Sequence, residues 1–140
     1  MAGDKKLFID ADVLVALNDK SDNNHQKAVT LVSLVSVART PLITSDPAFG
    51  EAITVISQNV SHKQAINFAI GTLSSQTEIV EVNSGLRQQG LEIFEKQTSK
   101  NSRFTDSINM AIMKNEKLDT IFSFDEHYKK NGFKRFGIDK

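Results

Sequence analysis

The chain has 140 residues, of which 39% are hydrophobic, and this size and composition predict a single domain over residues 1–140 with a buried core. It contains no cysteine, which excludes disulfide bonds, thiolate metal sites and a cysteine nucleophile. Seventeen basic and seventeen acidic residues give a formal net charge of zero, so a globally basic surface, the simplest indication of nucleic-acid binding, is missing.

The beginning of the chain carries a short apolar run and not a targeting segment. Residues 1–10 have too few apolar residues for a signal peptide or a membrane span, so we expect a cytoplasmic protein. Within them Leu7–Ile9 is fully apolar and stops at Asp10. This pattern is typical of a buried parallel strand that ends at the carboxyl edge of a sheet.

Strand and helix patterns alternate along the rest of the chain. Further strands are predicted at residues 41–44, 78–82 and 121–124, with a weak fifth strand around Phe136. Helices are predicted to begin near Asn24, Asp46, Ser61, Asn83 or Ser84, and Thr105, and the first, third and fourth of these helices have Asn or Ser as candidate N-caps.

This order of elements predicts an α/β fold. Strands separated by one or two helices require crossover connections, which are right-handed between parallel strands. The result is a three-layer α/β/α arrangement, a mainly parallel sheet with helices on both faces. Ligands of such sheets bind beyond the carboxyl ends of the strands. Asp10 and Asp125 both follow predicted strands, so both are expected at this edge.

Four acidic residues are candidates for one site: Asp10, Glu51, Asp106 and Asp125. Each has an ordinary explanation alone, because acids commonly end strands and are favoured at helix N-termini. Carboxylates that converge without basic partners would repel one another and become protonated unless a cation lay between them. A hard divalent ion such as Mg²⁺ prefers oxygen ligands and can activate water to attack a phosphodiester.

Four motifs in this order resemble the PIN domain family, in particular its VapC-type toxin ribonucleases. They are Phe8–Leu14 around Asp10, Thr44–Asp46 leading to Glu51, Phe104–Ser107 around Asp106, and Phe122–Asp125. The resemblance covers nearly the whole chain and implies a flavodoxin-like sheet of strand order 3-2-1-4-5. It also implies an endoribonuclease that depends on Mg²⁺ or Mn²⁺ and is the toxin of a type II toxin–antitoxin pair.

The resemblance assigns roles to the acids. Asp10, Glu51 and Asp106 correspond to three central acids of the family, and Asp125 to a more variable fourth. We rank Asp10 and Asp106 as direct metal ligands, Glu51 as the residue that orients or shares a metal-bound water, and Asp125 as the most dispensable. Three further residues are expected to support the site: Thr105, Ser123 and Asp12. At Asp12 the family often has Asn or Ser, and we interpret Asp12 as a helix cap in preference to an extra ligand.

Substrate and partner expectations also follow from the resemblance. They are RNA, a small antitoxin protein that inhibits the site, and a second copy of the chain in a homodimer. Basic residues near the predicted mouth are candidates to bind RNA phosphates: Lys100, Arg103, Lys129 and Lys130. The spacing of the three histidines fits no compact zinc motif, and only His127 is close enough in sequence to the acids to contact a substrate.

Two alternative functions remain open from the sequence. The segment Asp10–Asp12 also resembles haloacid-dehalogenase-type phosphatases, in which Asp10 would be the nucleophile and Asp12 the general acid. That interpretation leaves Glu51 and Asp106 without a role, and no lysine is placed as the third motif of those enzymes requires. The chain could instead be a degenerate PIN binding module, because the fold alone fixes no function. The presence of all four acids argues against degeneration.

Overall fold

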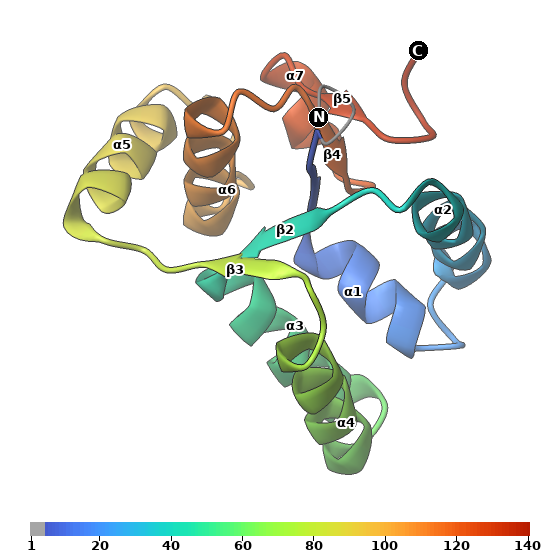
Figure 1. Cartoon of the computed structure of the whole chain (residues 1–140). Helices are drawn as coiled ribbons and strands as arrows, with labels where there is room; N and C mark the ends of the chain where they lie inside the picture. Colours follow the sequence, from blue (N-terminus) through green and yellow to red (C-terminus); the bar gives the residue numbers. More distant parts are fainter. Residues whose placement is uncertain (1–4) are drawn as a thin grey trace.

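The computed structural model describes residues 5–140, in which five parallel strands form one sheet (Figure 1). The strands are β1 (Leu7–Ile9), β2 (Leu42–Ser45), β3 (Glu78–Val80), β4 (Thr120–Phe122) and β5 (Lys134–Arg135). Their spatial order is β3-β2-β1-β4-β5, and every neighbouring pair is parallel. The predicted strand order and three-layer fold are therefore confirmed.

The predicted lack of a targeting segment at the start of the chain includes residues 1–4, which lie outside the described residues. Over residues 5–140, none of the helices has both the length and the apolar character needed to cross a membrane.

The central strand β1 is buried on both faces. Leu7 and Ile9 pack into one core cluster, and Phe8, which points the opposite way, packs into a second. A strand between two cores must be apolar at every position. This requirement explains why the first polar residue, Asp10, appears only where the strand ends.

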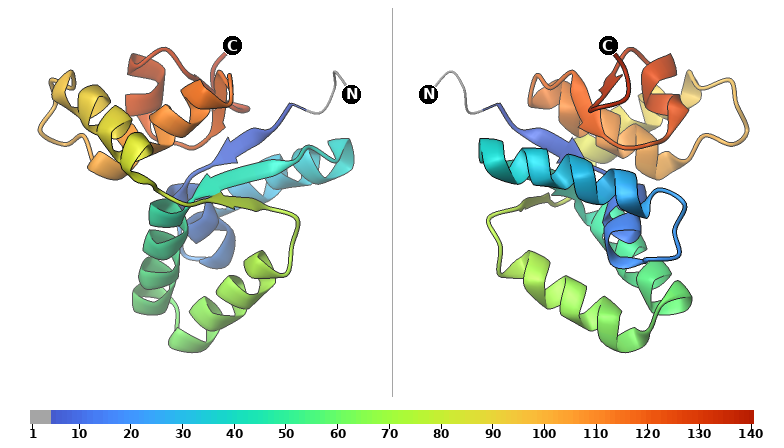
Figure 2. Two further views of the ribbon diagram at one scale, coloured as in Figure 1. Left: turned by 60° about the vertical axis from the view of Figure 1, so that its left-hand side comes forward. Right: turned by 90° about the vertical axis from the view of Figure 1, so that its right-hand side faces the viewer.

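In the described part of the chain, seven helices divide between the two faces of the sheet (Figure 2). One face packs against α1 (Ala11–Asn18), α2 (His25–Ala38), α3 (Asp46–Asn59) and α4 (His62–Leu73). The other face packs against α5 (Ser84–Glu95), α6 (Phe104–Asn115) and the short α7 (Glu126–Lys130). Each layer thus buries one side of the same strands.

Side-chain capping agrees with the sequence at two predicted helix starts and fails at one. Ser61 accepts a hydrogen bond from the Gln64 amide to cap α4, and Asn83 caps α5 in the same way. Asn24 occupies the N-cap position of α2, but its side chain makes no capping hydrogen bond. Its backbone has φ −98° and ψ 5°, not the extended conformation that directs a capping side chain at the first turn. Helix α2 therefore begins where the sequence predicts, but the capping hydrogen bond expected from the Asn24 side chain does not form.

The sequence patterns do not predict α1 or α7. In α1, five of the eight residues are buried, so apolar residues cover most of its surface and no one-sided helical period appears. With five residues, α7 is too short to show a period at all. Both helices begin next to a candidate site residue, because Asp10 is the N-cap of α1 and Asp125 is the N-cap of α7.

Candidate active site

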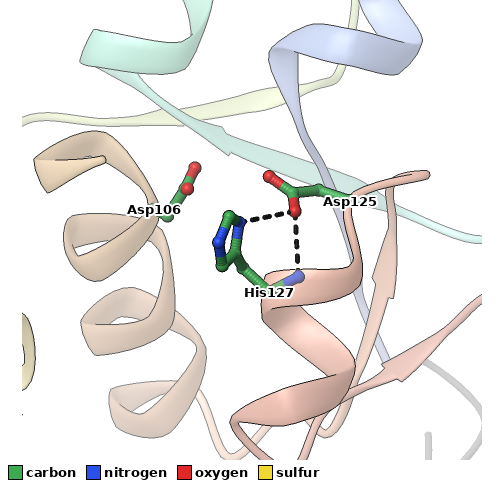
Figure 3. Close-up of side chains that lie close together, drawn as sticks. All are labelled: Asp106, Asp125 and His127. Carbon is green, nitrogen blue, oxygen red and sulfur yellow. Dashed lines mark hydrogen bonds and ion pairs between the residues drawn. The ribbon is translucent and has the colours of Figure 1, made fainter. Parts of the chain in front are cut away.

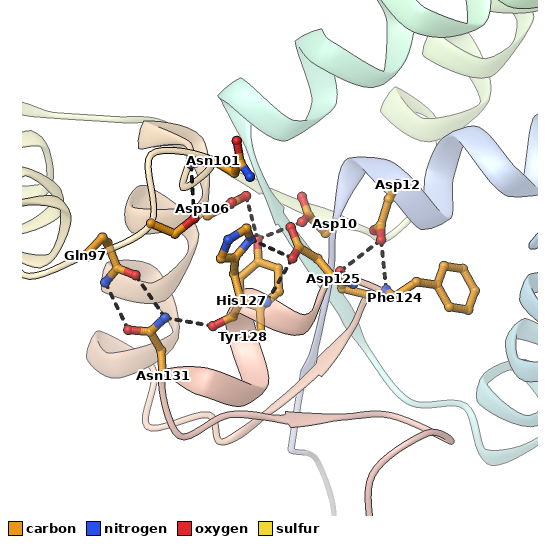
Figure 4. A network of polar contacts seen from close by, with 12 residues as sticks. Asp10, Asp12, Gln97, Asn101, Asp106, Phe124, Asp125, His127, Tyr128 and Asn131 are labelled. Carbon is orange, nitrogen blue, oxygen red and sulfur yellow. Dashed lines mark hydrogen bonds and ion pairs between the residues drawn. The ribbon is translucent and has the colours of Figure 1, made fainter.

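Asp10 holds its carboxylate in a buried set of hydrogen bonds at the end of β1 (Figure 4). Its Oδ1 accepts from the Ala11 amide at 2.7 Å and from Asn109 Nδ2 at 3.1 Å. Its Oδ2 accepts from the Tyr128 hydroxyl at 2.7 Å. Desolvation by burial, with the negative charge of Asp12 next in importance, raises the pKa of Asp10 to about 8 despite these donors. Among residues 5–140, the groups that donate to this carboxylate are all neutral.

A chain of buried polar groups fixes the amide of Asn109. Ser45 Oγ accepts from the Ala48 amide at 3.1 Å as the cap of α3, so its proton is free to be donated to Asn109 Oδ1 at 2.6 Å. Both hydrogens of Asn109 Nδ2 are then directed at Asp10 and at the Tyr128 hydroxyl, the latter at 2.9 Å. The orientation of this amide follows from its partners.

Sequence reasoning missed Asn109 and Tyr128 as site residues. The only available signal for Asn109 was its position one helical turn after Asp106, on the same face. Tyr128 similarly lies one turn after Asp125, in the helix that no pattern predicted. Both side chains are completely buried. Asn109 follows Asp10 by 99 residues and Tyr128 follows it by 118, yet both donate hydrogen bonds to its carboxylate.

Asp106 keeps an unsatisfied carboxylate oxygen. The Tyr128 hydroxyl has one proton, and it lies 2.7 Å from Asp10 Oδ2 but 3.3 Å from Asp106 Oδ1. The other oxygen of Asp106, Oδ2, is buried and has no hydrogen-bond partner among residues 5–140. Burial, with the negative charge of Asp125 next, raises the pKa of Asp106. A buried carboxylate oxygen without a donor is costly unless a cation neutralises it.

Asp106, Asp125 and His127 form a group of potential metal ligands (Figure 3). One ligand atom from each of the three lies within 4.8 Å of the others. Asp125 Oδ1 accepts from the His127 amide at 2.9 Å and lies 2.8 Å from His127 Nδ1. The sequence ranking placed Asp125 last among the acids. In the structure Asp125 belongs to this group, whereas Asp10 is connected to Asp106 through the Tyr128 hydroxyl.

Glu51 contacts a basic residue and none of the other three acids. Arg103 Nη1 lies 2.9 Å from Glu51 Oε2, and Arg103 is the N-cap residue of α6, three positions before Asp106. The expectation that the four acids converge without a basic partner therefore does not hold for Glu51. Both side chains are partly exposed, 63% for Arg103 and 33% for Glu51, so solvent weakens the ion pair and leaves it easy to break.

Asp12 holds the loop that carries Asp125. Its Oδ2 accepts from Ser123 Oγ at 3.0 Å and from the Phe124 amide at 2.8 Å, and Ser123 Oγ accepts from the Asp125 amide at 3.1 Å. Burial raises the pKa of Asp12 to about 6. The interpretation of Asp12 as a helix cap holds only in that its Oδ1 accepts from the Val13 amide in the first turn of α1, at 2.8 Å. Its carboxylate bonds across to the loop after β4, and the N-cap of α1 is the residue before Ala11, Asp10.

The remaining predicted residues surround this centre at different distances from it. Thr105 is half-buried in the first turn of α6, and within the described chain its side chain makes no hydrogen bond to the acids. Lys129 Nζ lies 3.7 Å from Asp139 Oδ1, and Arg103 is paired with Glu51. Lys100 and Lys130 are exposed. Their roles in RNA binding stay predictions.

The donor set suits a hard divalent cation. Asp106 and Asp125 offer carboxylate oxygens at a partly buried place. The pKa values of Asp10, Asp12 and Asp106 are all raised, chiefly because desolvation disfavours the charged carboxylates. Hydrogen bonds from Tyr128 and Ser123 hold the surrounding side chains in place, as the outer residues of metal sites commonly do.

Comparisons with known proteins agree with the fold. Residues 7–134 match the PIN domain family. The curated protein "23S rRNA-specific endonuclease VapC20" of Mycobacterium tuberculosis is 24% identical over 128 residues, which cover 91% of this chain and 95% of that protein.

Two solved structures are similar as well. The crystal structure of Mycobacterium tuberculosis VapC20, described as a Sarcin-Ricin loop cleaving toxin, has a TM-score of 0.80 at 22% identity, covering 91% of this chain and 96% of that one. Rickettsia felis VapBC2, bound to a DNA fragment from its promoter, gives a TM-score of 0.65 at 12% identity, covering 92% and 96%. At these identities the structures support the fold, and the match over residues 7–134 establishes the family: the chain belongs to the PIN domain family.

Proposed function

We propose that this protein is an endoribonuclease that depends on a divalent metal ion, Mg²⁺ or Mn²⁺. The observation that carries the proposal is the buried, unpartnered oxygen of Asp106, on a residue that shares a group of potential ligands with Asp125 and His127. This group lies at the carboxyl edge of a parallel sheet, where such folds bind their ligands. The naming of the relative VapC20 as an endonuclease supports the reaction class.

The residues divide into those that hold the ion and those that position them. Asp106 and Asp125 would hold the ion, with Asp10 and Glu51 binding it directly or through its waters. When bound, such an ion activates water and stabilises the negative charge that develops on a phosphodiester. Tyr128 and Asn109 keep the Asp10 carboxylate in one orientation by donating hydrogen bonds to both of its oxygens.

Two other sets of contacts involve residues at the entrance of the site. Asp12 and Ser123 fix the backbone before Asp125, so the Asp125 carboxylate is presented without ordering a loop during binding. Arg103, which is 63% exposed, pairs with Glu51 and can turn to a substrate phosphate at little cost because exposed ion pairs are weak. Glu51 is then available to the ion.

RNA as the substrate and a toxin role belong to the same proposal. The name of VapC20 specifies cleavage of 23S rRNA, and the Rickettsia felis structure is named as a VapBC pair on promoter DNA. The VapBC2 structure supports a cognate antitoxin for this protein, and we add a homodimer as its working assembly, as the family resemblance implies. A short neighbouring open reading frame with a DNA-binding pattern would support this partner, and a gene without one would count against it.

The phosphatase alternative is not favoured. A general acid in the position of Asp12 would have to reach the substrate, but the Asp12 carboxylate accepts three hydrogen bonds, from Ser123 Oγ and from the amides of Phe124 and Val13. Figure 4 shows Asp12 directed at the backbone of Phe124. The binding-module alternative lacks support because all four acids are present.

The Asp106→Asn substitution tests the central carboxylate. It keeps the shape of the side chain but removes the charge, so Mg²⁺-dependent RNA cleavage should fall by at least about 100-fold, the scale typical of losing a main electrostatic contact at a reaction centre. Expression of the wild type should arrest bacterial growth, and expression of Asp106→Asn should not. Asp119→Asn is the matched control, because Asp119 precedes β4 at the opposite edge of the sheet. Equal toxicity of wild type and Asp106→Asn would contradict the proposal.

The metal-free protein should become less stable as the pH rises, because the pKa of Asp10 is raised on folding. A carboxylate whose pKa is lowered on folding has the opposite effect. The pKa of Asp10 rises from 3.8 to about 8 on folding, so between these values the folded state binds more protons than the unfolded state. The free energy of unfolding should therefore fall as the pH rises from 6 to 8, by more than about 1 kcal/mol. Urea unfolding in a chelator measures this loss, and added Mg²⁺ should restore stability at pH 8. An Asp10→Asn variant that keeps the full pH dependence would refute the assignment to Asp10.

The hydroxyl of Tyr128 should contribute to metal affinity through the acids that it contacts. Tyr128→Phe retains the buried ring but removes the bonds to Asp10 and Asp106. We expect the affinity for Mn²⁺, measured by isothermal titration calorimetry, to fall by about 10- to 100-fold, as for other residues that orient metal ligands. The circular dichroism spectrum should stay that of the wild type. An unchanged Mn²⁺ affinity would show that the hydroxyl serves the core alone.

A further inference from the structure

A small cavity lies directly beside the candidate metal ligands. Its volume is about 160 Å³, and it is lined by residues from the end of α5, the loop that follows it and α7. His127, which is also a member of the group with Asp106 and Asp125, forms part of its wall. A ligand in this cavity would therefore be next to the reacting centre.

The charge of the cavity is positive. Lys96 and Lys130 line it, and among residues 5–140 no Asp or Glu does. Neither lysine forms an ion pair with another residue in the described part of the chain, in contrast to Lys129, which lies 3.7 Å from Asp139. Two ammonium groups without carboxylate partners attract an anion and leave its oxygens without competition.

The polar groups of the cavity wall include a free hydroxyl. Ser102 Oγ is buried and has no hydrogen-bond partner among residues 5–140, so it can donate to a ligand oxygen. Figure 4 shows Gln97 and Asn131 facing each other near His127. Their amides exchange hydrogen bonds at 2.9 and 3.1 Å, and Asn131 Nδ2 also donates to the His127 carbonyl at 2.7 Å.

The hydrogen bonds between Gln97 and Asn131 hold the cavity in shape without a ligand. They fix α7 against the end of α5, so Lys130 and Lys96 face the same space before any ligand enters. Ligand binding then costs less free energy, because these protein groups are already ordered. Two lysines and three hydroxyl-bearing residues line the wall, and among residues 5–140 its single aromatic ring is that of His127. This composition favours a phosphate over a stacked nucleobase.

We propose that this cavity binds the backbone phosphate of RNA that neighbours the phosphodiester to be cut. The inference rests on the proposed nuclease function, and it names how the same site positions its substrate. Lys96, Lys130 and Ser102 bind the neighbouring phosphate, while His127 separates it from the acids. The cavity thereby sets which linkage of the strand reaches Asp106 and Asp125.

The first experiment tests the cavity without any cleavage. Inorganic phosphate is titrated into the protein with a chelator present, and backbone amide shifts are followed by two-dimensional NMR. Saturable shifts are expected at Lys96, Ser102 and Lys130. In Lys130→Gln the apparent Kd for phosphate should rise at least about fivefold, whereas Lys134→Gln, an exposed lysine of β5 outside the cavity, should keep the wild-type value. Shifts that do not saturate, or that are equal in the two variants, would overturn the proposal.

The second experiment uses RNA. A short single-stranded RNA is made with one neutral methylphosphonate linkage, which is moved along the strand, and KM for cleavage is measured. In the wild type KM should rise at one linkage beside the cut, and Lys130→Gln should show no further rise at that linkage. The slope of log KM against log salt should fall by about 0.7 in Lys130→Gln, the value for one lost phosphate contact on a single strand.

The outcomes separate the two proposals. A wild type that cleaves no RNA with Mg²⁺ or Mn²⁺ overturns the proposed function, and the phosphate titration still decides the cavity. A wild type that cleaves RNA, with Lys130→Gln keeping the wild-type salt slope and the same sensitivity to the neutral linkage, overturns the phosphate site alone.

Discussion

Two buried carboxylates, Asp10 and Asp106, share a single hydroxyl proton from Tyr128, and the arrangement of the site depends on this constraint. The parallel sheet places Asp10 at its carboxyl edge, and the first turn of α6 brings Asp106 to the same place. Burying both acids raises their pKa values, which opposes folding at neutral pH. A cation relieves that cost, so stability and catalytic chemistry are linked through one set of oxygens.

Hydrogen bonds satisfy most of the polar groups around this pair, but one carboxylate oxygen of Asp106 is left without a donor among residues 5–140. Ser45, Asn109 and Tyr128 form a continuous chain of hydrogen bonds that ends on Asp10. Such a chain specifies one orientation for each member in a region of low dielectric. Asp106 Oδ2 remains without a partner in the described chain, although the groups close to it are tightly organised. An oxygen left open beside a rigid network is what a metal-binding site requires before the metal binds.

Local patterns in the sequence were sufficient for the sheet but not for the contacts that cross it. The apolar run before Asp10 indicates a strand that is buried on both faces of the sheet. The strand order followed from the family resemblance. No local period reports that Tyr128 lies against Asp10, or that Arg103 pairs with Glu51, because such contacts arise from packing between distant segments. For the same reason the sequence did not indicate that Asp12, besides accepting from the Val13 amide, binds the loop after β4.

Anomalous diffraction from crystals soaked in Mn²⁺ locates the ion without relying on activity, and so shows whether Asp106 binds it. We expect a peak within about 2.5 Å of a carboxylate oxygen of Asp106, with Asp125 or a water held by Asp10 completing its ligands. In crystals of Asp106→Asn the peak should be lost while the surrounding hydrogen bonds of Asn109 and Ser45 persist. A wild-type crystal that shows no peak at these acids, with Asp106 still lacking a partner at saturating Mn²⁺, would contradict the account.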